Sequence, residues 1–181
     1  MQILLHICCG NCAIYPVKRL RAQNHQLAGY FYNDNIHPFQ EFSKRLATTK
    51  EYAKKVDLPV TYDEQYRLED FLASVAQDPT NRCRHCYRSR LLATAKEAKR
   101  LEFEAFTTTL LYSRYQKHEE ILAFGQQLAI DYNLFFYYED FRKGWNEGIQ
   151  ISKQMSLYRQ QYCGCIYSEK ERFAPQKRAD R

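Results

Sequence analysis

The sequence lacks any long uninterrupted run of apolar residues. A membrane-spanning helix needs roughly 20 of them in succession, and no stretch of the chain approaches that length. The opening residues, Met1 to His6, also lack the basic region and the cleavage site of a signal peptide. We therefore expect a cytoplasmic protein with no membrane contact. Internal repeats and low-complexity segments are absent too.

Composition places the chain among globular proteins. Its 181 residues are 45% hydrophobic and 27% charged, which excludes a disordered and a fibrous protein. This length suits one compact α/β or α+β unit, and we expect a single domain over residues 1–173 followed by a basic tail over 174–181. A net charge of +6 with 15 Tyr and 11 Phe suits a polyanion with exposed bases, because cations neutralise phosphates and rings stack on nucleobases.

The seven cysteines are the most informative residues. A reducing compartment does not use disulfides as structural links, so the thiols need another explanation. Each of them belongs to a short cluster, whereas inert core cysteines are expected singly. The clusters are Cys8, Cys9 and Cys12; Cys83 and Cys86; and Cys163 and Cys165.

The spacing of apolar residues predicts strands alternating with helices. Strands are expected over 2–7, 27–32, 58–62, 103–110 and 134–138. Helices are expected after Cys12 with Pro16 in the first turn, and over 38–56, 69–77, 88–101, 117–132 and 146–161. The pattern predicts an α/β fold with a Rossmann-like, mostly parallel sheet flanked by helices, and with a small cysteine-bearing helical insertion.

The turn after the first strand occupies the place where functional sites form in such folds. With one glycine, Gly10, it is poorly suited to a phosphate loop, whereas thiolates are stabilised by the dipole at a helix N-terminus. The turn therefore predicts a metal site. Four or more thiolates select zinc or an iron–sulfur cluster, and the additional thiols favour iron and sulfur over zinc, with metal-free thiol redox chemistry as the remaining alternative.

The Cys163–Gly164–Cys165 segment has two interpretations. The glycine permits the backbone angles that a small disulfide ring requires, and the strain of such a ring makes it a redox-active couple. The alternative is that both thiols are metal ligands.

Five motifs resemble the epoxyqueuosine reductase QueH family, and together they span residues 1–173. The motifs are His6-Ile7-Cys8-Cys9-Gly10-Asn11-Cys12, Tyr30-Phe31-Tyr32-Asn33-Asp34-Asn35-Ile36-His37-Pro38, Arg82-Cys83-Arg84-His85-Cys86-Tyr87, Thr107 to Gln116, and Tyr162-Cys163-Gly164-Cys165. The sequence departs from the usual family pattern at Gly10-Asn11, where Ala-Pro is usual, and at Asp34 and Arg114, where proline is usual.

The resemblance implies a concrete activity and a set of site residues. Members of the family reduce the epoxide of epoxyqueuosine to queuosine at the wobble position of tRNA, the last step of tRNA queuosine biosynthesis. The acceptors are tRNAs with a GUN anticodon, those for Tyr, His, Asn and Asp. The resemblance implies a 4Fe-4S cluster on Cys8, Cys9, Cys83 and Cys86, and a catalytic redox-active disulfide between Cys163 and Cys165. It also implies a second, mononuclear iron, for which Cys12, Cys163 and Cys165 are the candidate ligands.

Several residues near the motifs are candidates for further roles. An electron donor is an expected partner, and we expect a monomer. Basic candidates for phosphate contacts are Arg82, Arg84, Arg88, Arg90, Lys96, Lys99 and Arg100, and candidate stacking rings are Tyr32, Tyr87, Tyr112 and Tyr115. We expect His6 to be a hydrogen-bonded core residue, while His37, His85 and Asp34 are candidate proton donors or ligands.

Two rival functions use the same residues differently. A non-catalytic, zinc-stabilised nucleic-acid-binding module would explain the thiols and the charge but leaves the Cys163/Cys165 pair without a role. A thiol-disulfide oxidoreductase acting on proteins makes poor use of three separate thiol clusters. Because iron–sulfur protein is brown and zinc protein is colourless, absorbance separates these rivals.

Overall fold

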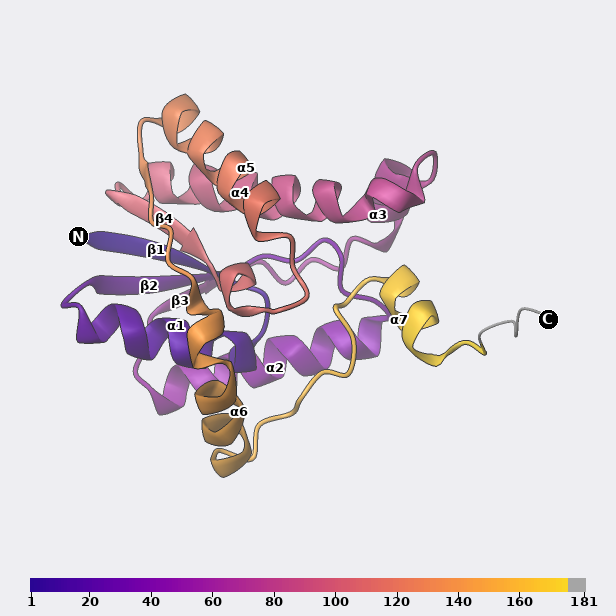
Figure 1. The fold of residues 1–181 in the computed structure, drawn as a ribbon, viewed down its shortest axis with the longest axis horizontal. Helices are drawn as coiled ribbons and strands as arrows, with labels where there is room; N and C mark the ends of the chain where they lie inside the picture. Colours follow the sequence, from indigo (N-terminus) through magenta and orange to yellow (C-terminus); the bar gives the residue numbers. More distant parts are fainter. Residues whose placement is uncertain (176–181) are drawn as a thin grey trace.

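The computed structural model describes residues 1–175 and is built on one five-stranded, all-parallel sheet (Figure 1). The strand order is β3-β2-β1-β4-β5, which confirms the expected Rossmann-like arrangement. The strands are β1 (Gln2–Ile7), β2 (Gln26–Phe31), β3 (Val60–Tyr62), β4 (Ala105–Thr108) and β5 (Phe135–Phe136).

Helices cover both faces of the sheet. Helices α1, α2 and α6 lie on one face, and α4 and α5 pack together on the other, while α3 and α7 lie beyond the carboxyl ends of the strands (Figure 1). The helices are α1 (Gly10–Ala22), α2 (Phe39–Lys55), α3 (Leu68–Val75), α4 (Arg82–Arg100), α5 (His118–Tyr132), α6 (Trp145–Gln154) and α7 (Ile166–Phe173). Short 3-10 helices are η1 (Pro79–Asn81), η2 (Thr109–Tyr112) and η3 (Phe141–Gly144).

The core surrounds the central strand β1, whose residues are buried from Ile3 to Ile7. Leu4 packs in the cluster that includes Leu91 of α4, and Leu5 packs in the cluster that includes Val17 of α1. A strand covered on both faces reads as a continuous apolar run, as this one does.

The pairing register places the carboxyl ends of β2, β1 and β4 side by side. Ile7 pairs with Phe31, and His6 pairs with Thr108. The residues that follow these strands, Cys8, Tyr32 and Thr109, therefore leave the sheet at the same edge. This is the edge where α/β folds form their sites.

Helix boundaries differ from the predicted ones at three positions. Helix α1 begins at Gly10, so Pro16 lies inside the helix and not in its first turn. Helix α4 begins at Arg82, which places Cys83 and Cys86 inside its first two turns. Helix α6 ends at Gln154, and two residues later Ser156 adopts a left-handed backbone conformation. An irregular segment, 155–165, then leads to α7, and the spacing of apolar residues did not identify this segment.

Within residues 1–175, no helix is long and apolar enough to cross a membrane. The predicted basic tail, 174–181, lies outside the described residues from position 176 onward.

Candidate active site

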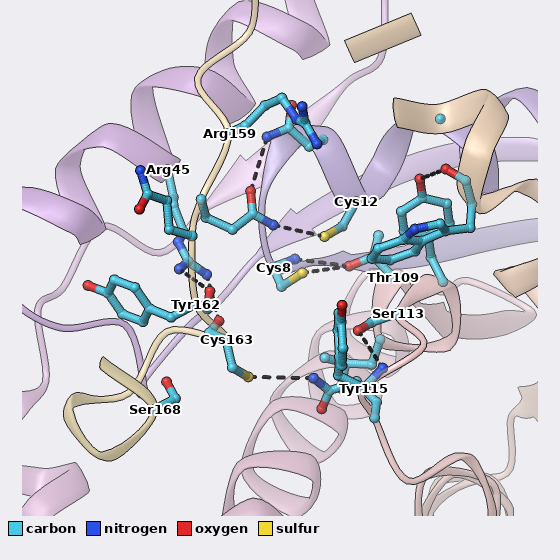
Figure 2. Close-up of a pocket in the computed structure, with 18 of the residues that line it drawn as sticks. Cys8, Cys12, Arg45, Thr109, Ser113, Tyr115, Arg159, Tyr162, Cys163 and Ser168 are labelled. Atoms are coloured by element: carbon cyan, nitrogen blue, oxygen red, sulfur yellow. Dashed lines mark hydrogen bonds between the residues drawn. The ribbon is translucent and has the colours of Figure 1, made fainter. Parts of the chain in front are cut away.

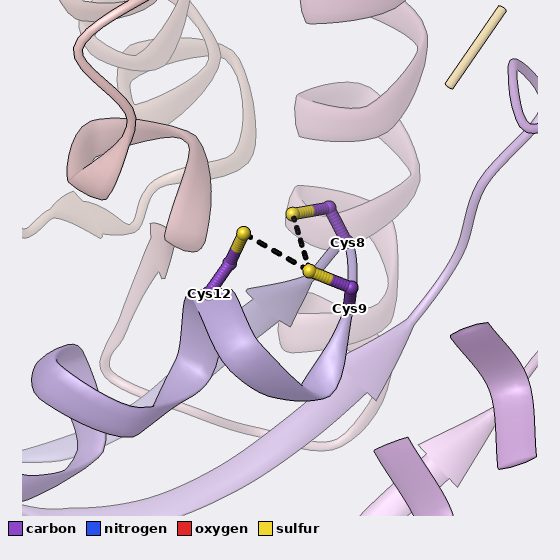
Figure 3. Close-up of side chains that lie close together, drawn as sticks. All are labelled: Cys8, Cys9 and Cys12. Atoms are coloured by element: carbon purple, nitrogen blue, oxygen red, sulfur yellow. Dashed lines mark hydrogen bonds between the residues drawn. The ribbon is translucent and has the colours of Figure 1, made fainter. Parts of the chain in front are cut away.

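Three thiols meet where β1 passes into α1 (Figure 3). The Sγ atom of Cys9 lies 4.0 Å from that of Cys8 and 3.0 Å from that of Cys12. All three sulfurs lie within 4.8 Å of one another, and they form the one such group of potential metal ligands in residues 1–175. Three soft donors at this spacing can hold a soft metal ion.

Local backbone geometry explains this convergence. Cys9 is the N-cap of α1 in extended conformation, and Cys12 follows one turn later on the same side of the helix. Gly10 allows α1 to approach α2 closely, because a Cβ atom at this position would lie 2.8 Å from the carbonyl oxygen of Thr48. The thiols are therefore held by the strand end and the first helical turn together.

The protonation of each of the three thiols depends on the other two. Hydrogen bonds from Cys12 and Cys9 hold the pKa of the Cys8 thiol well below its usual range. The Thr109 hydroxyl donates to Cys8 Sγ at 3.2 Å and lowers this pKa further. Donating to Cys8 raises the pKa of Cys12, and burial raises the pKa of Cys9. The group therefore shares negative charge that a bound cation would neutralise.

The other predicted cluster ligands lie on α4 and are not among these three sulfurs. Cys86 is buried with Cys165 in a small cluster that includes Phe71, and Cys83 is half-buried. Burial raises the pKa of both α4 thiols, and the neighbouring Cys163 raises them further. The structure thus pairs Cys8 and Cys9 most closely with Cys12, while the two α4 cysteines face Cys163 and Cys165.

The segment 155–165 carries Cys163 and Cys165, and we call it the strap. Arg45 of α2 binds the strap backbone through two hydrogen bonds. Its Nη1 donates to the carbonyl oxygen of Cys163 at 2.7 Å, and its Nη2 donates to the carbonyl oxygen of Tyr162 at 2.9 Å. Glu41 neutralises the buried Arg45 guanidinium with an ion pair of 2.7 Å. These contacts fix the strap backbone beside the thiols.

Both strap thiols are free, and they have different surroundings. Cys163 is exposed and accepts a hydrogen bond from Gln116 at 3.5 Å. Cys165 is buried, and its sulfur caps α7 by accepting from the Ser168 amide at 3.4 Å. Between them Gly164 has a φ of +152°, a conformation that favours glycine.

A cavity of about 590 Å³ opens above the thiols (Figure 2). Cys8 and Cys12 line it from one side and Cys163 from the strap. Aromatic and basic side chains complete its walls, among them Tyr112, Tyr115, Trp145, Arg90, Arg159 and Arg172. The cavity is large enough for one nucleoside, and its volume is typical of small-molecule sites.

A network of amides ties the strap to the cysteine turn. The Gln160 Nε2 donates to Cys9 Sγ at 3.1 Å and to Cys12 Sγ at 3.4 Å. Asn11 Nδ2 donates to Gln160 Oε1 at 3.0 Å and to the Tyr158 carbonyl oxygen at 2.5 Å, and its Oδ1 accepts from Ser152 at 2.8 Å. We call Asn11 and Gln160 the amide latch.

A buried cation faces the thiols without a carboxylate partner. Arg90 is 2% exposed, its Nε donates to the Cys86 carbonyl oxygen at 3.0 Å, and no carboxylate in residues 1–175 forms an ion pair with it. Asp34 and the thiols of Cys86, Cys163 and Cys8 lie around its guanidinium, and negative charge on these groups raises its pKa against the effect of burial. Because a buried charge needs an opposite charge, the ionised Asp34 and any thiolate at this site compensate Arg90.

The histidines divide into separate roles. His6 is satisfied in the core as predicted, with Nδ1 2.9 Å from Thr108 Oγ1 and Nε2 3.0 Å from the Tyr32 carbonyl oxygen, and burial lowers its pKa to about 4. Both ring nitrogens of buried His37 lack a hydrogen-bond partner within the described chain. The Nε2 atom of His85 lies 3.2 Å from Oδ2 of Asp34, which is buried at 5% exposure.

Asp34 remains ionised despite its burial. Burial alone would raise the pKa of the carboxyl group, but hydrogen bonds from His85 and Ser89 and the charge of Arg90 outweigh burial and lower it. The Oδ1 atom of Asp34 has no hydrogen-bond partner among residues 1–175.

The structure also sorts the basic and aromatic candidates. Arg82 pairs with Glu171, Arg84 with Glu120 and Arg100 with Glu97, so these cations are already engaged. Arg88, Lys96 and Tyr32 line a separate shallow groove on the α4 side, Lys99 is exposed outside it, and Tyr87 is buried. Tyr112 and Tyr115 are the two predicted rings that line the thiol cavity.

Sequence reasoning missed Arg45, Gln160 and Trp145. Arg45 follows Phe42 by three residues and precedes Thr49 by four, so helical spacing puts its charge on the buried face of α2. A charge at such a position is a detectable signal of a buried partner. Gln160 and Trp145 carry no comparable signal, because only the fold brings them to the thiols.

Comparisons with known proteins agree with this geometry. A family model described as epoxyqueuosine reductase QueH matches residues 3–171. A curated epoxyqueuosine reductase QueH of Dehalococcoides mccartyi is 36% identical over 95% of this chain and 94% of its own length. Another, of Thermotoga maritima, is 33% identical over 94% of this chain and 91% of its own length.

Among solved structures, one described as a predicted subunit of a tRNA methyltransferase from Methanocaldococcus jannaschii aligns with a TM-score of 0.58. It is 13% identical and covers 84% of this chain and 75% of its own, a likeness that extends to the fold alone. The family model, in contrast, spans the three cysteine clusters and almost all of the described chain. By this match and by its curated relatives, the chain belongs to the epoxyqueuosine reductase QueH family.

Proposed function

We propose that this protein reduces the epoxide of epoxyqueuosine to the alkene of queuosine, at the wobble position of tRNAs with a GUN anticodon. The family and its curated relatives support this activity. The observation that carries the proposal is that Cys8, Cys12 and Cys163 line one cavity with aromatic and basic walls. A modified base that is turned out of its stack would meet sulfur chemistry there.

The donor set fits an iron–sulfur group. The cysteine clusters lie at or beyond one edge of the sheet, the Gln160 amide donates to two sulfurs, and buried Arg90 places a positive charge near Cys8 and Cys86. In the division that the family implies, Cys8, Cys9, Cys83 and Cys86 hold a 4Fe-4S cluster, and Cys12, Cys163 and Cys165 are candidates for a second iron. When bound, such a cluster supplies low-potential electrons one at a time.

The chain itself can store the electron pair of the reaction. Converting an epoxide to an alkene consumes two electrons and two protons and releases one water. Oxidation of the Cys163 and Cys165 thiols to a disulfide releases two electrons and two protons, so one epoxide and one dithiol give one alkene, one water and one disulfide. An external electron donor then returns two electrons, and two protons re-form the thiols.

Each strap contact has a role in this scheme. Arg45 holds the Tyr162 and Cys163 carbonyl oxygens, so that Cys163 stays at the cavity wall. Gly164 supplies the backbone conformation between the two thiols. Because the Cys165 sulfur accepts from the Ser168 amide at the N-cap of α7, oxidation of this thiol would act at the start of that helix.

Metal analysis and a turnover assay test the proposal. Protein purified without oxygen should contain about four irons and four sulfides per chain, or slightly more iron, and should convert epoxyqueuosine in tRNA to queuosine with a chemical reductant. One or two zinc ions without sulfide, and no conversion, would instead support the zinc-stabilised binding module, which the family match does not favour.

A strap variant tests the dithiol separately. Cys163→Ser should lose repeated turnover, while Gln154→Ala, a change at an exposed residue next to the strap that does not line the cavity, should retain it. A Cys163→Ser enzyme that turns over repeatedly at the wild-type rate would remove the dithiol from the scheme and leave the reductase assignment intact.

A further inference from the structure

Tyr115 is a large aromatic side chain held at the rim of the thiol cavity. Its side chain is 84% exposed, although it lines the same cavity as Cys8 and Cys163. The Tyr115 amide donates to Ser113 Oγ at 3.2 Å, which fixes the turn that carries the ring. The ring is therefore accessible to a molecule that enters the cavity.

The ring rests on an anchored column of aromatic side chains. Its edge contacts Trp145, with ring centroids 6.0 Å apart and planes at 79°. Trp145 stacks on Tyr112, with ring centroids 5.1 Å apart and an angle of 29° between the ring planes. The Tyr112 hydroxyl donates to the Trp145 carbonyl oxygen at 2.9 Å. Tyr115 therefore offers a free face on a rigid support, which reduces the entropy that binding must overcome.

Two cations without a carboxylate partner among the described residues lie at this site, Arg114 next to Tyr115 in the chain and Arg159 across the thiols from it (Figure 2). The Arg114 guanidinium lies 5.6 Å from the Trp145 ring centroid, and Arg159 is exposed at the cavity. Neither forms an ion pair with a carboxylate in residues 1–175, whereas the cavity's one acidic side chain, Glu171, is engaged by Arg82. Figure 2 shows Tyr115 and Arg159 on either side of Cys8 and Cys12.

We propose that Tyr115 is the stacking surface of a nucleobase subsite at the entrance of the thiol cavity. It takes an unpaired base of a single-stranded RNA loop, and Arg114 and Arg159 bind the phosphates on either side of that base. A free aromatic face between cations is the arrangement by which proteins hold single-stranded nucleic acid. The inference rests on the proposed function for the identity of that RNA, the anticodon loop.

Binding of an unreactive RNA tests the subsite without catalysis. The probe is a short anticodon stem-loop with guanosine at the wobble position, labelled for fluorescence anisotropy and titrated into the metal-loaded protein. Tyr115→Ala should weaken binding by about tenfold, the effect of losing one stacked base, whereas Tyr115→Phe should bind like wild type. Tyr138→Ala is the matched control, because Tyr138 is also exposed but does not line the cavity.

Two further readouts separate stacking from charge. Tyr115→Ala should leave the salt dependence of binding unchanged, whereas Arg114→Gln and Arg159→Gln should each reduce its slope by about one phosphate contact. Trp145 is the chain's single tryptophan, so RNA that occupies the subsite should change its intrinsic fluorescence.

The outcomes distinguish the subsite from the reductase activity. Wild-type affinity in Tyr115→Ala, together with Trp145 fluorescence that saturating RNA does not change, would overturn the subsite even if the enzyme reduces epoxyqueuosine. If the wild-type protein binds the stem-loop through Tyr115 but does not reduce epoxyqueuosine in tRNA, the subsite stands and the proposed function fails.

Discussion

At the scale of single residues, Asn11 shows how a polar side chain organises the thiols. The residue uses both ends of its side-chain amide. It binds Tyr158 and Gln160 of the strap and Ser152 of α6. Gln160 in turn donates to Cys9 and Cys12. Asn11 therefore connects the cysteine turn to the strap and to α6.

Asn11→Ala should release the amide latch. The Tyr158 carbonyl oxygen and Oε1 of Gln160 then lose the hydrogen bonds that Asn11 donates. Polar groups left without a partner in a partly buried network lower the free energy of unfolding by about 1–3 kcal/mol. Urea unfolding of the metal-free protein should show this loss, and hydrogen exchange should accelerate at 158–163. Gln161→Ala, a change at an exposed strap residue, should show neither effect. Unchanged exchange in Asn11→Ala would mean that Arg45 alone holds the strap.

At the scale of elements, the turn between η2 and α5 carries Tyr115 and is closed by a histidine. His118 begins α5, is 8% exposed, and its Nε2 lies 3.3 Å from the Ser113 carbonyl oxygen. Burial lowers the pKa of His118 below 6.5, and the charge of Arg142 lowers it further. Burial and Arg142 therefore favour the neutral imidazole, and they outweigh the hydrogen bond to the Ser113 carbonyl oxygen, which favours the protonated form.

The pH dependence of stability should show this histidine. Because its folded pKa lies below 6.5, the unfolded chain binds more protons between these values, and stability falls as pH drops below about 6.5. His6 and His37 contribute in the same direction. The comparison is therefore between wild type and His118→Gln, unfolded by urea at several pH values from 7.5 to 5. The variant should lose less stability on acidification, and parallel curves would contradict this role for His118.

At the scale of the whole molecule, the thiols come from three distant parts of the chain. Cys8, Cys9 and Cys12 follow β1, Cys83 and Cys86 begin α4, and Cys163 and Cys165 end the strap. A group bound to thiols from more than one segment would cross-link the fold and would bind the folded state alone. The expected monomeric state stays a prediction, which light scattering of the loaded protein can measure.

Loading with iron and sulfide should raise the thermal midpoint of unfolding, and anaerobic chelation should reverse the increase. Cys83→Ser tests whether α4 supplies a ligand: the metal-free variant should unfold near the wild-type midpoint, and its gain on loading should be smaller. An equal gain in Cys83→Ser and wild type would confine the metal to other thiols. The same measurement on Cys12→Ser determines whether Cys12, the nearest neighbour of Cys9, belongs to the ligand set.

The sequence by itself predicted the five strands, the order of the helices up to α6 and all three cysteine clusters, because periodicity and spacing are local properties of the chain; it did not predict α7. Gln2 to Ile7 reads as a buried strand, and the thiols after it indicate soft-metal chemistry at a helix N-terminus. Only the tertiary structure decided that Cys12 lies beside Cys9, that the strap is irregular, and that Arg45, Gln160 and Trp145 line the thiol cavity. These contacts join residues more than a hundred positions apart or depend on side-chain hydrogen bonds, and neither leaves a period in the sequence.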